Sequence, residues 1–163
     1  AFVRAAELSA DEVRRSSRLA AAAEAAWAAG QPERARELIA RALPLTTGHA
    51  RAELLYLRGV IQARTGDLRG AVAVLVEAAD TSQDASLTLE MLTEATEAAE
   101  WAGEYIQAAA VSARAEAIEP RGDTARFRVA ALRGLAAELA GDHEAAAPLL
   151  RQAMRHAERL EER

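Results

Sequence analysis

The 163-residue sequence contains no cysteine and no lysine, and all 20 of its basic residues are arginine. The absence of cysteine excludes disulfide bonds, thiolate nucleophiles and thiolate metal ligands. The absence of lysine excludes a phosphate-loop lysine and Schiff-base chemistry. Aromatic residues make up only 4% of the chain and β-branched residues are few, which disfavours β-sheet.

Long apolar runs and a basic surplus are also missing. No apolar stretch reaches the roughly 18 residues that a membrane helix needs, and no charged-then-apolar leader opens the chain. The net charge of -5 argues against a nucleic-acid footprint. We therefore expect a soluble, cytoplasmic protein that contacts neither membrane nor nucleic acid directly.

What the sequence does have is an internal repeat marked by small residues. Glycines recur at spacings of 36, 37 and 38 residues, each five residues before one alanine and twelve before another. The glycines are Gly30, Gly66, Gly103 and Gly141. The alanines are Ala35, Ala71, Ala108 and Ala146, then Ala42, Ala78, Ala115 and Ala153. Such a period is typical of stacked two-helix units, because each unit buries its apolar face only against its neighbours.

Local signals predict the ends of the helices. Ser9 and Glu12 form a capping box, Pro32 suits the first turn of a helix, and Pro44 ends one. Asp67 and Asp123 are expected to cap helices, and Pro148 is expected to kink the last helix or displace its start. The expected helices span about residues 9–29, 31–43, 48–65, 68–79, 86–102, 104–118, 123–140 and 142–160.

Gly59 and Gly134 lie in the middle of two expected helices, where glycine costs about 1 kcal/mol relative to alanine. Both precede the turn glycine of their repeat by seven residues, so we expect a neighbouring helix to pass too close there for a side chain. Ala23 fits the same phase, Thr96 fits it less well, and Gly70 is given no role.

The repeat resembles a divergent tetratricopeptide pattern over essentially the whole chain. The small residue in mid-helix, the turn glycine and the two alanines match that pattern, and Pro120 matches its closing proline. Its early tryptophan is replaced by Leu19, Leu55, Leu92 and Ala130, and the units are two to four residues longer. The resemblance implies an all-α, right-handed α-solenoid of about four antiparallel helix pairs plus a leading half-repeat at residues 1–8. We expect residues 1–163 to be one such repeat domain, a piece of a longer chain.

Two stretches carry a second resemblance. The segments LAAAAEAAWAAGQPERARELIARAL (19–43) and LRGVIQARTGDLRGAVAVLVEAA (57–79) resemble the central helical region of large ATP-dependent LuxR-type transcriptional regulators. The resemblance implies a sensing or interaction segment of such a regulator. The nucleotide-binding and DNA-binding parts of those proteins match no residue of this sequence.

No catalytic, cofactor-binding or metal-binding residues are predicted. His143 and Glu144 begin like a zinc-protease helix, but Ala147 stands where the second histidine is needed. His156 and Glu158 lie on different helical faces. All three histidines, including His49, are interpreted as surface residues, and no serine has a plausible set of catalytic partners.

A binding face is predicted from geometry, because the first helix of each pair lines the concave side of such arrays. In this set, acidic residues outnumber basic ones by six to two, which suits a protein or small-molecule effector with cationic and apolar groups. In the alternative interpretation the two tryptophans fill gaps in the core. The predicted concave-face residues are Glu24, Trp27, Glu53, Tyr56, Val60, Arg64, Glu90, Glu97, Glu100, Trp101, Arg128, Leu135 and Glu138.

Three functions follow as hypotheses. The first is a non-enzymatic ligand- or protein-binding segment of a LuxR-type regulator, coupling signal sensing to domains outside this sequence. The second is a free-standing tetratricopeptide adaptor for protein assembly, and the third is a small helical hydrolase or metal enzyme. Exposed apolar ends of a repeat array also make homo-oligomers possible.

Overall fold

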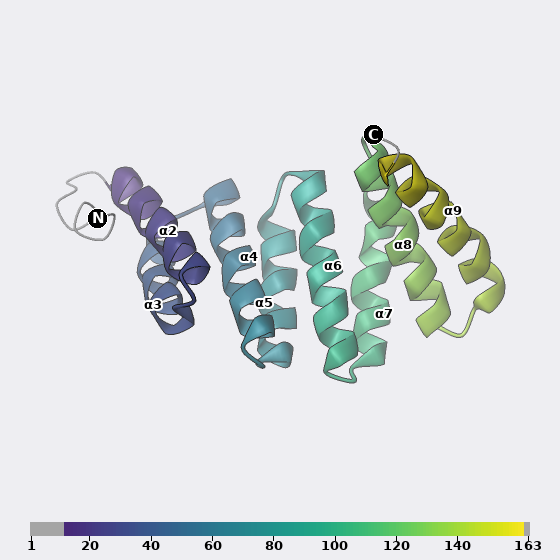
Figure 1. The fold of residues 1–163 in the computed structure, drawn as a ribbon, viewed down its shortest axis with the longest axis horizontal. Coiled ribbons are helices and arrows are strands. Elements are labelled where there is room, and N and C mark those ends of the chain that lie inside the picture. Colours follow the sequence, from purple (N-terminus) through teal and green to yellow (C-terminus); the bar gives the residue numbers. More distant parts are fainter. Residues whose placement is uncertain (1–11, 162–163) are drawn as a thin grey trace. The chain divides into compact units, whose positions relative to one another are not determined.

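A computed structural model describes residues 12–161 of the chain. All regular structure in this part is helical, with eight α-helices and two short 3-10 helices (Figure 1). The chain divides into two compact units, Ala1–Thr81 and Ser82–Arg163. The expected half-repeat at residues 1–8 and the capping serine at residue 9 lie outside the described residues. The expectation of a single domain stays a prediction.

The first unit consists of two helix pairs. In chain order its elements are α2 (Glu12–Ala28), α3 (Pro32–Ala42), the 3-10 helix η1 (Leu43–Leu45), α4 (Gly48–Arg64) and α5 (Leu68–Thr81). Helix α2 packs mainly on α3, and α4 packs mainly on α5. The sequence-adjacent helices therefore form hairpins, as the repeat predicts.

The second unit repeats this plan. Its elements are α6 (Ala85–Trp101), α7 (Tyr105–Ala113), the 3-10 helix η2 (Arg114–Ala117), α8 (Asp123–Leu139) and α9 (His143–Glu161). Helix α6 packs on α7 and α8 packs on α9, while α7 also packs on α8.

The four repeat glycines make the turn inside each hairpin. Each has a positive φ, between 70° and 95°, a conformation that glycine adopts without steric cost. At Gly30 the amide donates to the carbonyl of Trp27, and the next amide, of Gln31, donates to the carbonyl of Ala26 at 2.9 Å. The same two hydrogen bonds recur at the other three glycines. Each first helix thus ends in a Schellman motif, which explains why glycine recurs there.

The repeat alanines form the contact surfaces of the second helices. All eight are buried, with exposed fractions between 0% and 5%, because a methyl group lets two helices approach closely. The residues at the place of the missing tryptophan are buried as well, and they are Leu19, Leu55, Leu92 and Ala130. The pattern of small residues therefore predicted the core correctly.

Two expected helices end early. Instead of running through residues 31–43 and 104–118, α3 ends at Ala42 and α7 ends at Ala113, and each continues as a 3-10 helix. Pro44 lies within η1 and has no amide to donate. In α7, Ser112 Oγ donates to the carbonyl of Ala108 at 2.8 Å, a local bond that competes with regular helix geometry.

Helix α9 runs through Pro148 without a displaced start. Pro148 is exposed, so the Glu144 carbonyl that loses its helical donor lies at a solvent-facing turn.

The N-cap of α8 is Gly122, and the expected cap, Asp123, is instead the first helical residue. Asp123 still lies in the first turn, where a carboxylate is favoured by the helix dipole.

Gly70, to which no role was assigned, lies beneath a helix cap. Its amide donates to Asp67 Oδ1 at 3.1 Å, and a β-carbon on residue 70 would lie 2.2 Å from Asp67 Oδ2. The carboxylate therefore lies directly over the α-carbon of Gly70. This contact was not apparent from the repeat, because no other unit has glycine at that place.

Candidate functional site

The first unit has a hollow of about 330 Å³ between α2 and α4. It brings together two of the predicted concave-face residues, Glu24 and Glu53. Glu53 lies 3.3 Å from His49 Nε2, whereas Glu24 has no partner among the described side chains. Leu54 and Leu57 supply apolar lining. The hollow thus combines carboxylates with an apolar wall.

The other predicted residues of the first unit lie outside this hollow. Trp27 is half-buried and packs against the hydrophobic core. Tyr56 and Val60 are half-buried, and Arg64 is exposed. Trp27 therefore contacts the core and is also partly accessible to solvent.

In the second unit, two predicted residues form an ion pair between α6 and α8. Arg128 Nη1 lies 2.7 Å from Glu90 Oε1, and both side chains are half-buried. Leu135 is half-buried as well. The Glu90–Arg128 pair neutralises part of the predicted acidic face, so the remaining negative charge comes from Glu97, Glu100 and Glu138.

Trp101 is 70% exposed and lies at the last position of α6. Two further large apolar side chains follow at the start of α7, Tyr105 with 59% and Ile106 with 91% of its surface exposed. We call these three residues the α6–α7 corner. Tyr105 and Ile106 were not among the predicted residues, because the prediction was confined to the first helix of each pair. Trp101 is not a core residue.

The histidines differ from one another. His49 and His143 are exposed, as expected, but His156 is only 8% exposed. It lies on the same face of α9 as the buried Ala146 and Ala153, at helical spacing. The interpretation of His156 as a surface residue is therefore wrong. Its Nδ1 has no hydrogen-bond partner.

His143 pairs with Glu138, another predicted concave-face residue. His143 Nδ1 and Glu138 Oε2 are 3.0 Å apart. The hydrogen bond to Glu138 raises the pKa of His143 above 6.5, and the charges of Glu138 and Asp142 act in the same direction. The net charge at this end of α8 therefore depends on pH.

Among residues 12–161, no cluster of three or more His, Asp or Glu side chains is arranged to hold a metal ion. In the same range, no helix combines the length and the apolar character required to span a bilayer.

These helical hairpins define a tetratricopeptide-like repeat fold, and comparison with solved structures shows the same fold. The crystal structure of MamA superposes with a TM-score of 0.73 at 18% identity, covering 100% of this chain and 88% of that one. A candidate kinesin light chain of Podosopora anserina with nearly identical TPR-like repeats gives a TM-score of 0.68 at 17% identity, covering 98% and 83%. No family model and no curated protein sequence matches the chain.

Proposed function

We propose that the chain is a non-enzymatic adaptor module that binds a partner protein through a segment rich in basic and apolar side chains. The tetratricopeptide-like fold supports this proposal, because such repeats present extended surfaces for binding. The observation that carries it is the α6–α7 corner, where Trp101, Tyr105 and Ile106 are exposed within six residues of one another.

The exposure of the corner is unusual for this composition. The chain has only two tryptophans and two tyrosines, and one of each lies at this corner. Grouped exposed apolar residues mark interaction sites more often than scattered ones do. Tryptophan and tyrosine also dominate the energetics of protein interfaces, since they bury a large area and lose little side-chain entropy.

The charges near the corner favour a basic partner. Glu97 is exposed and Glu100 is half-buried, and neither has a partner among the described side chains. Carboxylates steer a cationic segment toward the site, and an arginine of the partner can stack on the Trp101 ring. In the first unit, the hollow with Glu24 and Glu53 offers the same combination of carboxylates and apolar wall.

A labelled amphipathic helical peptide containing arginine and leucine tests this proposal by fluorescence anisotropy. We expect Trp101→Ala or Ile106→Ala to weaken binding at least about tenfold, a typical effect for an interface anchor. Met154→Ala is the matched control, because Met154 is also 64% exposed but lies on α9. Glutamate in place of the peptide arginines should abolish binding. Equal affinities for the wild type and both corner variants would contradict the proposal.

The finer assignment to a LuxR-type regulator rests on the two sequence stretches alone. The solved structures that match the chain share its fold, which supports a binding module in general and adds nothing specific to a regulator. A reading frame that encodes a phosphate-loop domain before these residues and a helix-turn-helix after them would establish the regulator. A cytoplasmic location and self-association stay predictions.

A further inference from the structure

Within residues 12–161, five of the six exposed large apolar side chains belong to two surfaces of the second unit. Three of them form the α6–α7 corner. The other two are Leu150 and Met154 on α9, with exposed fractions of 38% and 64%. They are four residues apart, so they are neighbours on one side of the helix. The second unit therefore has two separate surfaces with grouped apolar side chains, the kind of surface that marks an interaction site.

The exposure of Leu150 is particular to the last hairpin. The residues at the same place in the other three hairpins are Ile39, Leu75 and Ser112, at spacings of 36, 37 and 38 residues that match those of the turn glycines. All three are at most 1% exposed. On α9, a position that the repeat otherwise buries is therefore open.

A row of arginines runs beside this apolar pair. Arg151, Arg155 and Arg159 follow one another at four-residue spacing, which places them along one side of α9. All three are exposed, and none has a partner among the described side chains. Arg151 precedes Met154 by three residues, so the basic row and the apolar pair are adjacent. Between residues 150 and 159 the only carboxylate is that of Glu158, so basic residues outnumber acidic ones by three to one.

We call Leu150, Met154 and the three arginines the α9 face. It has the chemistry of a basic amphipathic helix, and the α6–α7 corner has the opposite charge. Glu97 precedes Trp101 by four residues, so the two side chains share one side of α6. An arginine stacks favourably on a tryptophan ring, and a methionine thioether makes favourable contacts with aromatic rings. The two surfaces are therefore complementary in charge and in the type of their apolar groups.

We infer that the α6–α7 corner of one copy of the chain binds the α9 face of a second copy. The inference rests on the proposed function, because it names α9 as the basic and apolar segment that the corner binds. Leu150 and Met154 pack on the apolar side chains of the corner, while the arginine row pairs with Glu97 and Glu100. Every side chain in this contact is exposed except Glu100, which is half-buried.

The contact joins two different surfaces, and this determines how copies can assemble. Two copies that make the contact reciprocally form a closed dimer, whereas a single contact leaves one corner and one α9 face open to further copies. In either arrangement, a copy that lacks only its corner and a copy that lacks only its α9 face retain one complementary pair between them.

Sedimentation equilibrium of the chain tests the inference. The weight-average mass of the wild type should rise with concentration above the 17.3 kDa of one chain. We expect a dissociation constant of about 10–1000 µM, because small interfaces are weak. Trp101→Ala in the corner and Arg155→Glu on the α9 face should each weaken self-association at least about tenfold. A glutamate at residue 155 lies four residues from both Arg151 and Arg159, so helix α9 itself is not weakened.

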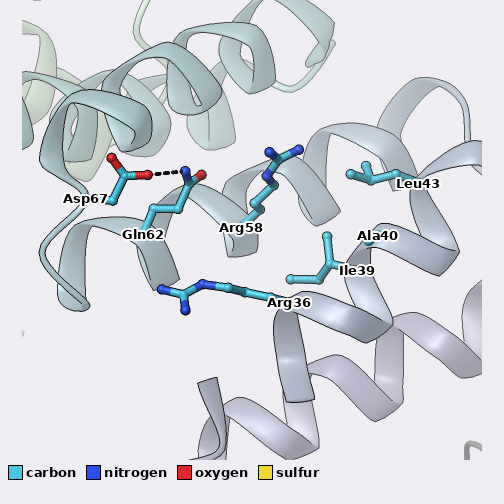
Figure 2. Close-up of a pocket in the computed structure, with 7 residues that line it drawn as sticks. All are labelled: Arg36, Ile39, Ala40, Leu43, Arg58, Gln62 and Asp67. Carbon is cyan, nitrogen blue, oxygen red and sulfur yellow. Dashed lines mark hydrogen bonds between the residues drawn. The ribbon is translucent and has the colours of Figure 1, made fainter. Parts of the chain in front are cut away.

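Mixing the two variants provides a sharper test. An equimolar mixture of Trp101→Ala and Arg155→Glu should associate more tightly than either variant alone and should stop at two chains. Arg58→Glu is the matched control and should associate like the wild type. Arg58 is exposed like Arg155, but it lies beside a hollow between α3 and α4 of the first unit (Figure 2).

Three outcomes of these measurements would overturn the inference. The first is a mass that stays at 17.3 kDa up to about 1 mM. The second is equal self-association by the wild type and either surface variant, with circular dichroism verifying that the variants are folded. The third is a mixture that associates no more tightly than its components. Binding of the arginine–leucine peptide at the corner without any self-association would leave the proposed function intact and overturn only this inference.

Discussion

Gly59 in α4 lies directly against Leu75 in α5, so closely that a β-carbon on residue 59 would be 2.5 Å from Leu75 Cγ. Leu75 is fully buried and cannot move away without disturbing the packing around it. The cost of glycine within a helix is therefore offset by close contact between α4 and α5.

Enlarging residue 59 should destabilise the first unit. We expect Gly59→Leu to lower the free energy of unfolding by more than about 1 kcal/mol, because overpacking costs about 1–3 kcal/mol and the better helix propensity of leucine returns less than that. Urea unfolding followed by circular dichroism measures the change. Adding Leu75→Ala should make the combined loss smaller than the sum of the two single losses. Strict additivity would show that these residues are not in conflict.

The close approach was predictable because the same phase recurs in every unit. Gly134 repeats the relationship with Leu150, whose Cδ2 would be 2.7 Å from an added β-carbon. Thr96 fits the phase less well by size, yet it is buried. The residue 16 positions later, which is leucine in the glycine-containing units, is Ser112 in that unit. Thr96, which is larger than glycine, is thus matched by Ser112, which is smaller than leucine.

Other features could not be read from the repeat. The exposure of Ile106 depends on how α7 is rotated on α6, which small-residue spacing does not determine. His156 looked like a surface residue because polar residues surround it in the sequence, although its spacing from Ala153 places it on the inner face of α9. Similarly, the role of Gly70 depends on where the Asp67 side chain folds back.

Replacing Gly70 by alanine should stabilise the chain, in contrast to enlarging Gly59. The clash at residue 70 involves the carboxylate end of Asp67, which can rotate. At the start of α9, Ala145 donates the equivalent hydrogen bond to Asp142 Oδ1 at 3.0 Å, so a β-carbon is compatible with this cap. We expect Gly70→Ala to raise the free energy of unfolding by up to about 1 kcal/mol, measured by urea unfolding. A clear loss of stability would mean that Asp67 is held in place.

Removing the polar group of His156 should stabilise the second unit. Its Nδ1 is buried without a hydrogen-bond partner, and such a group costs about 1–3 kcal/mol. We expect His156→Leu to raise the midpoint of thermal unfolding, while His49→Leu, at an exposed position, should change it little. A lower midpoint for His156→Leu would indicate that the imidazole fills the space better than an aliphatic side chain does.

The pairing of His143 with Glu138 should be visible in its titration. Because the pKa of His143 is raised in the folded chain, the pair contributes stability below the unfolded pKa of about 6.5. That contribution is lost as the pH rises through the folded pKa. Imidazole resonances in a proton–carbon NMR titration should give a midpoint above 6.5, and Glu138→Gln should move it downward. Glu24→Gln, in the other unit, serves as the control, and an unchanged midpoint in Glu138→Gln would argue against the pair.

The two tryptophans should differ in their accessibility to a quencher. Trp101 is 70% exposed, whereas Trp27 is half-buried against the core of the first unit. We expect acrylamide to quench the Trp27→Phe variant, which retains only Trp101, with the steeper Stern–Volmer slope. The Trp101→Phe variant, which retains Trp27, should show a shallower slope and a fluorescence maximum at shorter wavelength. A basic peptide that occupies the α6–α7 corner should reduce the slope for Trp101 and leave that for Trp27 unchanged. Equal slopes without peptide would mean that Trp101 is covered in solution, and the corner could then not serve as a free binding surface.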